Sequence, residues 1–304
     1  MSFLINPYIY AGATIYDDAN AIYSLRRPDM TTLWTNAVAK VRRSSDNAVV
    51  YLFFDGAGAD ATISTSSFIS TTSQTTPDAT TLATWLGAND MFYEDIYAIT
   101  PDNTIDANKT LVQGTTALQP RGALSGTIST KNSLPLVDHV TGTRHMRSVF
   151  NSKLDPGNLF TVLSVSHQDT STSNAVVWTS SSTSTSYIAT RNDRRTQKRA
   201  MVQLDSGTTV NSDLTAQVDS SNQRLLTAIH NATNNILYNK TTLQTTTAHL
   251  SASYTNDRFQ VGANAGGIAP FLDGGWQEII IFDSDKTADI SPIQSNIVTY
   301  YSIP

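Results

Sequence analysis

Apolar and polar residues alternate along much of this chain, in short runs that are separated by polar turns. Early runs lie at 21–25, 37–42 and 49–54, and the last of these is apolar on both faces, which predicts a central strand. The second half continues the pattern at intervals of about 8–12 residues. Its runs are 159–167, 175–178, 187–189, 200–202, 224–230, 235–239 and 258–261. Regular short strands with Gly, Asn, Ser and Asp in the turns are typical of a β-sandwich.

The end of the chain has the clearest local pattern. A glycine-rich stretch (262–275) leads into the apolar run 276–282, which predicts a buried strand. Ser291 and Pro292 then precede a one-sided apolar pattern that ends near Tyr301. Because proline is favoured at the first helical position, this pattern predicts a terminal helix. A buried strand followed by a helix that covers it is a common way to complete a sandwich.

Only one other helix is expected, and the rest of the chain reads as strand and loop. Residues 76–87 have a proline at their second position, Pro77, and end with Gly87, which predicts a helix of about three turns. Residues 62–76 are rich in serine and threonine and are expected to form a solvated loop. We therefore expect an all-β fold with one or two short helices. Its domains are an N-terminal arm or edge strand over 1–20 and a single β-sandwich over 21–304.

Composition supports the all-β prediction and excludes several classes of function. Serine and threonine make up about a quarter of the chain, and these residues favour strands, caps and turns. Glutamate, a common residue on exposed helices, occurs only at Glu94 and Glu278. The net charge of −5 favours neither a nucleic-acid partner nor a membrane surface. Cysteine is absent, which excludes disulfides and thiolate metal sites. No signal peptide or membrane span is recognisable, so we expect a protein that is made without secretion and does not insert into membranes.

Two stretches resemble a known family of enzymes. Residues 41–48 read Val-Arg-Arg-Ser-Ser-Asp-Asn-Ala, and residues 277–282 read Gln-Glu-Ile-Ile-Ile-Phe. Both are similar to the catalytic domain of the fungal α-L-arabinofuranosidase B family and its bacterial and phage relatives. The resemblance implies a concanavalin-A-like (laminin-G-like) jelly roll, a sandwich of two antiparallel sheets. It also implies a retaining hydrolase, which needs two carboxyl groups about 5–5.5 Å apart across a cleft.

The chain departs from the family where the chemistry would take place. The region that corresponds to the nucleophile strand, 159–178, contains no glutamate and offers His167 and Asp169 instead. The glycine loop that carries the family's acid has no carboxylate until Asp273. The family's YDQSG segment is replaced by 97–102. We therefore expect no catalytic residues and no enzyme activity, and the alternative is an active arabinofuranosidase-type hydrolase with relocated carboxylates.

Other acidic residues have a structural and a functional interpretation. Glu278 lies on the predicted last strand, where a buried carboxylate with hydrogen-bond partners is favoured over a catalytic group. Glu94 and Asp95 follow the predicted helix and are expected to be a solvated loop pair. Asp283 and Asp285 have a spacing that calcium sites use, but a turn before the last helix is favoured. The histidines show no metal-binding spacing, so neither a metal nor a cofactor is expected.

Sugar binding is the function that the aromatic residues suggest. Trp178 and Trp276 are the candidate stacking platforms, with Asn264 and Asp273 as hydrogen-bonding partners for a carbohydrate. A solvated hairpin is the favoured interpretation of the basic cluster at 191–199, and a docking patch that includes Arg194 and Arg195 is the alternative. A free lectin-like module is one form that a sugar-binding function could take.

The combination of features favours a bacteriophage virion protein, such as a tail fibre, a receptor-binding protein or a capsid-decorating appendage. The N-terminal arm resembles the short anchoring arms of such appendages, and Phe3, Tyr8 and Tyr10 are the residues expected to dock on a neighbour. The expected location is therefore the virion. The expected partners are other virion proteins of the tail or capsid, host surface glycans, and further copies of the chain, with a trimer favoured.

Overall fold

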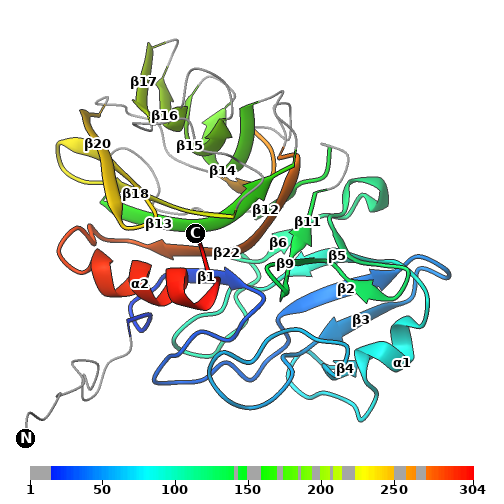
Figure 1. The fold of residues 1–304 in the computed structure, drawn as a ribbon. Coiled ribbons are helices and arrows are strands. Elements are labelled where there is room, and N and C mark those ends of the chain that lie inside the picture. Colours follow the sequence, from blue (N-terminus) through cyan, green and yellow to red (C-terminus); the bar gives the residue numbers. More distant parts are fainter. Residues whose placement is uncertain are drawn as a thin grey trace, which may run out of the picture.

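The protein is an antiparallel β-sandwich with two α-helices in the described part of the chain (Figure 1). The computed structural model describes residues 15–139, 143–148, 159–169, 174–183, 186–193, 199–205, 208–213, 223–249, 258–264 and 272–304. The helices are α1 (Leu82–Leu86) and α2 (Ile290–Tyr300), with a 3-10 turn at Thr116–Leu118.

The strands follow one another along the whole described chain. They are β1 (Ala21–Ser24), β2 (Ala39–Arg43), β3 (Val49–Leu52), β4 (Ile69–Ser70), β5 (Met91–Ile96), β6 (Leu111–Val112), β7 (Arg121–Leu124), β8 (Thr127–Ile128), β9 (Thr130–Lys131), β10 (Leu134–Pro135), β11 (Val137–Asp138), β12 (Met146–Ser148), β13 (Phe160–Gln168), β14 (Asn174–Thr183), β15 (Ser186–Asp193), β16 (Arg199–Asp205), β17 (Thr208–Asp213), β18 (Arg224–His230), β19 (Asn234–Asn239), β20 (Thr242–Ala248), β21 (Arg258–Val261) and β22 (Gly274–Phe282).

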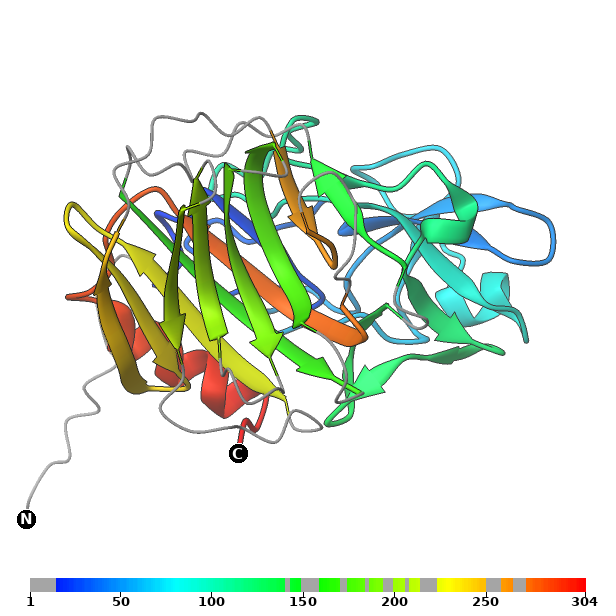
Figure 2. The same ribbon diagram turned by 90° about the horizontal axis from the view of Figure 1, so that it is seen from above.

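Two layers of antiparallel strands face each other. One layer runs in the order β4–β3–β2–β5–β6–β12–β21–β14–β15–β16–β17. The other runs β20–β19–β18–β13–β22–β1. Strands β11 and β7 connect the layers, because β11 pairs with β22 and with β7, and β7 pairs with β5. Figure 1 shows α2 against the outer face of the second layer, and Figure 2 shows the long strands side by side.

Strands β13 and β22 form the centre of the second layer. Every residue of both strands is buried, because α2 covers one face and the other layer covers the opposite face. This double burial is the reason that their sequences are apolar without strict alternation. The first strand of the layer, β1, pairs with the last, β22, from Ala21 opposite Ile281 to Ser24 opposite Glu278. The two ends of the described chain therefore complete one sheet.

The C-terminal predictions are confirmed. The apolar run at 276–282 lies in β22, and the one-sided pattern after Pro292 is α2, with Ile290, Ile293 and Ile297 buried. The fold class is likewise the expected all-β jelly-roll sandwich with short helices.

The predictions between residues 62 and 96 are partly wrong. Helix α1 begins only at Leu82, because the backbone of residues 78–82 forms hydrogen bonds with residues 67–69 instead of continuing the helix, as in the 2.7 Å bond from the Asp78 amide to the Ile69 carbonyl. The serine-rich stretch before it is not simply a solvated loop, since it contains β4, which pairs with β3. Glu94 and Asp95 lie in β5 and are half-buried, where a β-bulge places both opposite Lys40.

Residues 15–20, the described part of the expected arm, lie against the sandwich. Tyr16 is fully buried, and its hydroxyl donates to Asn296 of α2 at 2.7 Å. The arm boundary at residue 20 stays a prediction, and residues 1–14 lie outside the described chain. No helix in the described ranges is long and apolar enough to cross a membrane.

Candidate functional site

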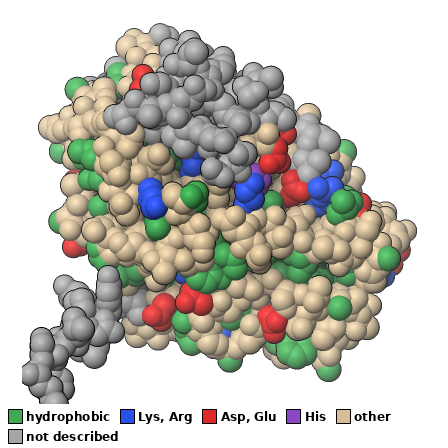
Figure 3. Space-filling view, viewed as in Figure 1, with side chains coloured by type: hydrophobic (Ala, Val, Ile, Leu, Met, Phe, Trp, Pro, Cys, Tyr) green, Lys and Arg blue, Asp and Glu red, His purple; other side chains and the backbone are tan. Residues whose placement is uncertain are grey.

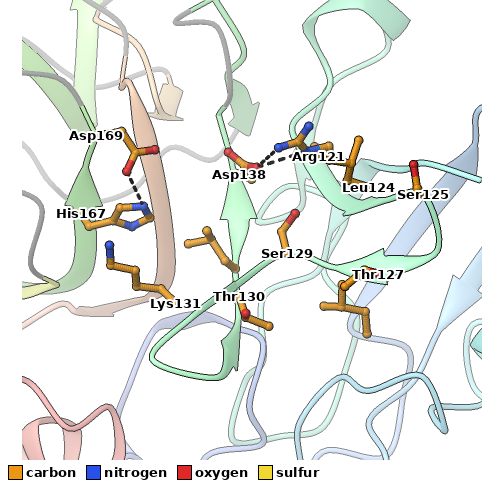
Figure 4. A pocket seen from close by; sticks show the side chains of 12 residues that line it. Arg121, Leu124, Ser125, Thr127, Ser129, Thr130, Lys131, Asp138, His167 and Asp169 are labelled. Atoms are coloured by element: carbon orange, nitrogen blue, oxygen red, sulfur yellow. Dashed lines mark hydrogen bonds and ion pairs between the residues drawn. The ribbon is translucent and has the colours of Figure 1, made fainter.

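A pocket of about 680 Å³ lies where the β7–β8 hairpin and the β9–β10 hairpin meet the end of β13 (Figure 4). The space-filling view shows acidic and basic side chains gathered beside one another on this face of the molecule (Figure 3). The pocket is lined by hydroxyl, charged, imidazole and aliphatic side chains from five strands (β7, β8, β9, β11 and β13) and from the residues that flank them. Its residues are Arg121, Leu124, Ser125, Thr127, Ile128, Ser129, Thr130, Lys131, Leu136, Asp138, His167 and Asp169.

One wall of the pocket carries an arginine–aspartate pair. Arg121 of β7 and Asp138 of β11 are direct cross-strand partners, so their side chains share a face of the sheet. The Nε and Nη2 groups of Arg121 both donate to Oδ2 of Asp138, at 3.2 and 2.7 Å. Two charge-assisted hydrogen bonds therefore converge on one oxygen of the Asp138 carboxylate.

The opposite wall carries His167 and Asp169 at the end of β13. The Nε2 atom of His167 lies 3.4 Å from Oδ1 of Asp169, whose side chain is 60% exposed (Figure 4). Burial lowers the pKa of His167 from 6.5 to about 4, although the neighbouring carboxylate acts in the opposite direction. His167 is therefore a neutral imidazole at pH 7. Its Nδ1 atom is buried and finds no hydrogen-bond partner within the described chain.

Lys131 reaches the pocket from the β9–β10 hairpin. The amide of Gln277, on β22, donates to the carbonyls of Lys131, Leu134 and Pro135 at 3.2, 3.0 and 3.0 Å. This amide fixes the hairpin on the sheet, and the Lys131 side chain extends towards His167 (Figure 4). Among the described residues, no carboxylate lies within 4.0 Å of its ammonium group. The pocket therefore contains a cation that is free to bind a ligand.

The two tryptophans predicted to stack on sugars are fully buried. Trp178 packs on Phe259, with ring centroids 5.9 Å apart. The Trp276 indole donates to Nε2 of His139 at 3.1 Å, and Nδ1 of His139 donates to the carbonyl of Arg144 at 2.7 Å. Neither indole offers a face to a ligand in this structure, because both point into the core between the layers. Both residues support the fold, and the prediction of exposed platforms is wrong.

The other predicted binding residues lie near the pocket or outside the described chain. Asp273 directly precedes β22, and its carbonyl accepts a hydrogen bond from the Asp169 backbone at 2.8 Å, which places it beside the pocket wall. Asn264 is partly buried just after β21 and does not line the pocket. The docking candidates lie outside the described residues: Phe3, Tyr8, Tyr10, Arg194 and Arg195.

Sequence reasoning missed Arg121, Lys131 and Asp138. The signal that could have found them is weak, because each is an isolated charge in a short strand. Only the register between β7 and β11 brings Arg121 and Asp138 together. His167 and Asp169 were singled out in the sequence, and the structure places both in the pocket.

The remaining acidic candidates have structural partners. Glu278 is buried and accepts from Nε and Nη2 of Arg26, both at 3.1 Å, as the structural interpretation requires. Glu94 forms an ion pair with Lys40 at 2.5 Å. Asp285 accepts from the Thr287 backbone at 2.8 Å in the turn before α2. Within the described ranges, no group of three His, Asp or Glu residues could hold a metal ion.

Comparison with known proteins relates the chain to others through its fold. No family model and no curated protein matches it. Among solved structures, a GH54 α-L-arabinofuranosidase soaked with a cyclic sulfate inhibitor has a TM-score of 0.61 at 12% identity. An arabinofuranosidase complexed with arabinofuranosyl-α-1,2-xylobiose has a TM-score of 0.61 at 14% identity.

Both alignments cover 93% of this chain and 63% of the other protein. The chain thus spans less than two thirds of the length of these structures. A further GH54 structure, a mutant soaked with 4-nitrophenyl α-L-arabinofuranoside, gives a TM-score of 0.60 at 13% identity. The chain has the β-sandwich fold of the arabinofuranosidases.

Proposed function

We propose that this chain is a glycan-binding β-sandwich of a bacteriophage virion, which uses the pocket at Lys131 and His167 to bind a sugar of the host surface. The observation that supports sugar binding is the mixed lining of the pocket. Carboxylates and hydroxyls accept hydrogen bonds there, and arginine and lysine donate them. Leu124, Ile128 and Leu136 provide aliphatic surface for the C–H face of a sugar ring.

The chemistry of the pocket residues supports sugar binding without hydrolysis. A retaining glycosidase needs one carboxyl group that is protonated and can act as an acid. Asp138 receives two hydrogen bonds from Arg121, which favour its ionised form. His167 is neutral at pH 7 and has little tendency to hold a proton for transfer. Neither group has the properties of a general acid.

The virion part of the proposal rests on composition and on the resemblance to phage relatives. The chain lacks cysteine, is rich in serine and threonine, and begins with a segment that carries Phe3, Tyr8 and Tyr10. In this proposal the segment docks on other tail or capsid proteins, and the copies assemble as a homo-oligomer, with a trimer favoured. Deleting residues 1–14 is expected to release the protein from particles. Truncated protein that still co-purifies with virions would contradict the virion role.

Sugar binding is tested with a glycan array and calorimetry on the full chain. The Lys131→Gln variant removes the free cation of the pocket and is expected to weaken binding by roughly tenfold, as expected for a charge-assisted hydrogen bond. Arg147→Gln is the matched control, because Arg147 is an exposed cation on β12 that does not line the pocket. Equal affinities for the two variants, or no binding by the wild type, would refute the proposed site.

An active hydrolase is the second candidate, because Asp138 and Asp169 line the same pocket in an arabinofuranosidase fold. In that case the wild type would release nitrophenol from 4-nitrophenyl α-L-arabinofuranoside, and Asp169→Asn would abolish turnover. Binding of the sugar without turnover supports the non-catalytic proposal.

A further inference from the structure

Three arginines gather around the ring of Phe92 beside the pocket. Arg42 of β2 and Arg121 of β7 are both register partners of Phe92 on β5, so the three side chains share one face of the sheet. The guanidinium carbon of Arg42 lies 4.9 Å from the Phe92 centroid, and that of Arg144 lies 5.1 Å from it. The ring therefore holds two guanidinium groups by cation–π contact.

Only one of these arginines has a counter-ion within the described chain. Asp138 pairs with Arg121. Arg42 is 8% exposed and donates to neutral acceptors, from Nε to Gln119 at 2.8 Å and from Nη1 to Asn47 at 2.9 Å. Arg144 has no carboxylate within 4.0 Å among the described residues, and its Nη1 atom is buried without a hydrogen-bond partner there. Two of the three arginines therefore have no carboxylate in direct contact among the described residues.

Burial acts on both of the uncompensated groups in the same direction. It lowers the pKa of Arg42 and of Arg144, and for Arg144 the nearby Arg121 lowers it further. A guanidinium that is partly removed from water and lacks an anionic partner is stabilised when an oxyanion arrives. The free Nη1 atom of Arg144 is the donor that such a ligand would satisfy.

The position of Arg144 is fixed from the core. Its carbonyl accepts from His139, which in turn accepts from the buried Trp276. Its guanidinium is close enough to Arg121 and Asp138 of the pocket to interact with both electrostatically. Arg144 is therefore held behind the wall that Arg121 and Asp138 form, and its charge acts on both of these pocket residues.

We propose that Arg144 binds an oxyanion of the glycan, so that the ligand class of this pocket is an acidic sugar that carries a carboxylate or a sulfate. This inference rests on the proposed glycan binding. Phe92 is the positioning residue, because its ring holds the Arg144 guanidinium by cation–π contact.

The test compares charged and uncharged forms of the same sugars by calorimetry on the full chain. Oligogalacturonate is compared with its methyl ester, and dextran sulfate with dextran. The wild type is expected to bind one charged form roughly tenfold to a hundredfold more tightly than its uncharged form. The pair that shows the preference identifies the oxyanion as a carboxylate or a sulfate.

The Arg144→Gln variant is expected to lose this preference while it keeps its affinity for the uncharged form, and Arg144→Lys is expected to keep part of it. Arg147→Gln removes the same positive charge from an exposed position on β12 and is expected to retain the preference. Thermal melting confirms that each variant is folded. Equal binding of charged and uncharged forms by the wild type would overturn the acidic-sugar inference and leave glycan binding intact. No binding of any of the four sugars would overturn both.

Discussion

The buried pair of Arg26 and Glu278 allows a quantitative prediction. Each side chain is 1% exposed, and two hydrogen bonds of 3.1 Å join them. Replacing Glu278 by Gln removes the negative charge and leaves the guanidinium buried. Its remaining ionic partner is Asp60, at 3.0 Å, which is 53% exposed and therefore well screened. Breaking a buried ion pair from one side costs about 3–5 kcal/mol of folding free energy.

The assay is urea unfolding of Glu278→Gln and of Asp60→Asn under identical conditions. Glu278→Gln is expected to lower the free energy of unfolding by about 3–5 kcal/mol, and Asp60→Asn by less than about 1 kcal/mol. The double replacement Arg26→Met with Glu278→Leu is expected to be less destabilised than Glu278→Gln, because no unpaired charge stays buried. Similar losses for Glu278→Gln and Asp60→Asn would refute this reasoning. Glycan binding by folded Glu278→Gln is expected to be unchanged, since Glu278 does not line the pocket.

Two further predictions concern the pH dependence of folding stability, and a third concerns a tightly packed glycine. Burial lowers the pKa of His139 from 6.5 to about 4, so the unfolded chain binds more protons than the folded chain between these pH values. The free energy of unfolding should therefore fall by up to about 3 kcal/mol as the pH drops from 6.5 to 4. In His139→Gln the free energy of unfolding should change less with pH across this range. Burial raises the pKa of Asp95 from 3.8 to about 6, so the folded chain binds more protons than the unfolded chain between these pH values. Stability should therefore fall as the pH rises from 4 to 6. Asp95→Asn should raise the melting temperature at pH 7 and leave it unchanged at pH 3.5. Gly262 has a φ of +84°, and a Cβ added there would lie 2.2 Å from the His139 ring. Gly262→Ala should therefore lower the free energy of unfolding by at least about 2 kcal/mol and change the fluorescence of Trp276, which bonds to His139. Gly58→Ala is the control, because a Cβ at Gly58 would have nothing within 4 Å, and it should produce neither effect.

The sequence was most informative where local pattern decides structure. Strand β22 is buried on both faces, so its apolar run could be recognised without its partner strands. Pro292 indicated the terminal helix, although α2 begins two residues earlier, at Ile290. The length of α1 was not predictable in the same way. Backbone hydrogen bonds from residues 78–82 to residues 67–69 outweigh the helical signal around Pro77.

The pocket was only partly predictable. His167 and Asp169 could be found because they occupy the place where the resembled family has its nucleophile. Arg121 and Asp138 lie 17 positions apart and meet only through strand register, which a single sequence does not specify. The role of Trp276 was misassigned: it belongs to the apolar run that predicts a buried strand, and the structure buries its side chain within β22.

The pairing of β1 with β22 has a consequence for biosynthesis. The ribosome makes residues 278–281 about 250 residues after their partners at 21–24. Until then Arg26 lacks the carboxylate that neutralises it, and the edge of the nascent second layer is open. The sandwich must therefore acquire its native topology after β22 has been made, and chaperones that shield open strand edges are expected to bind the nascent chain until then.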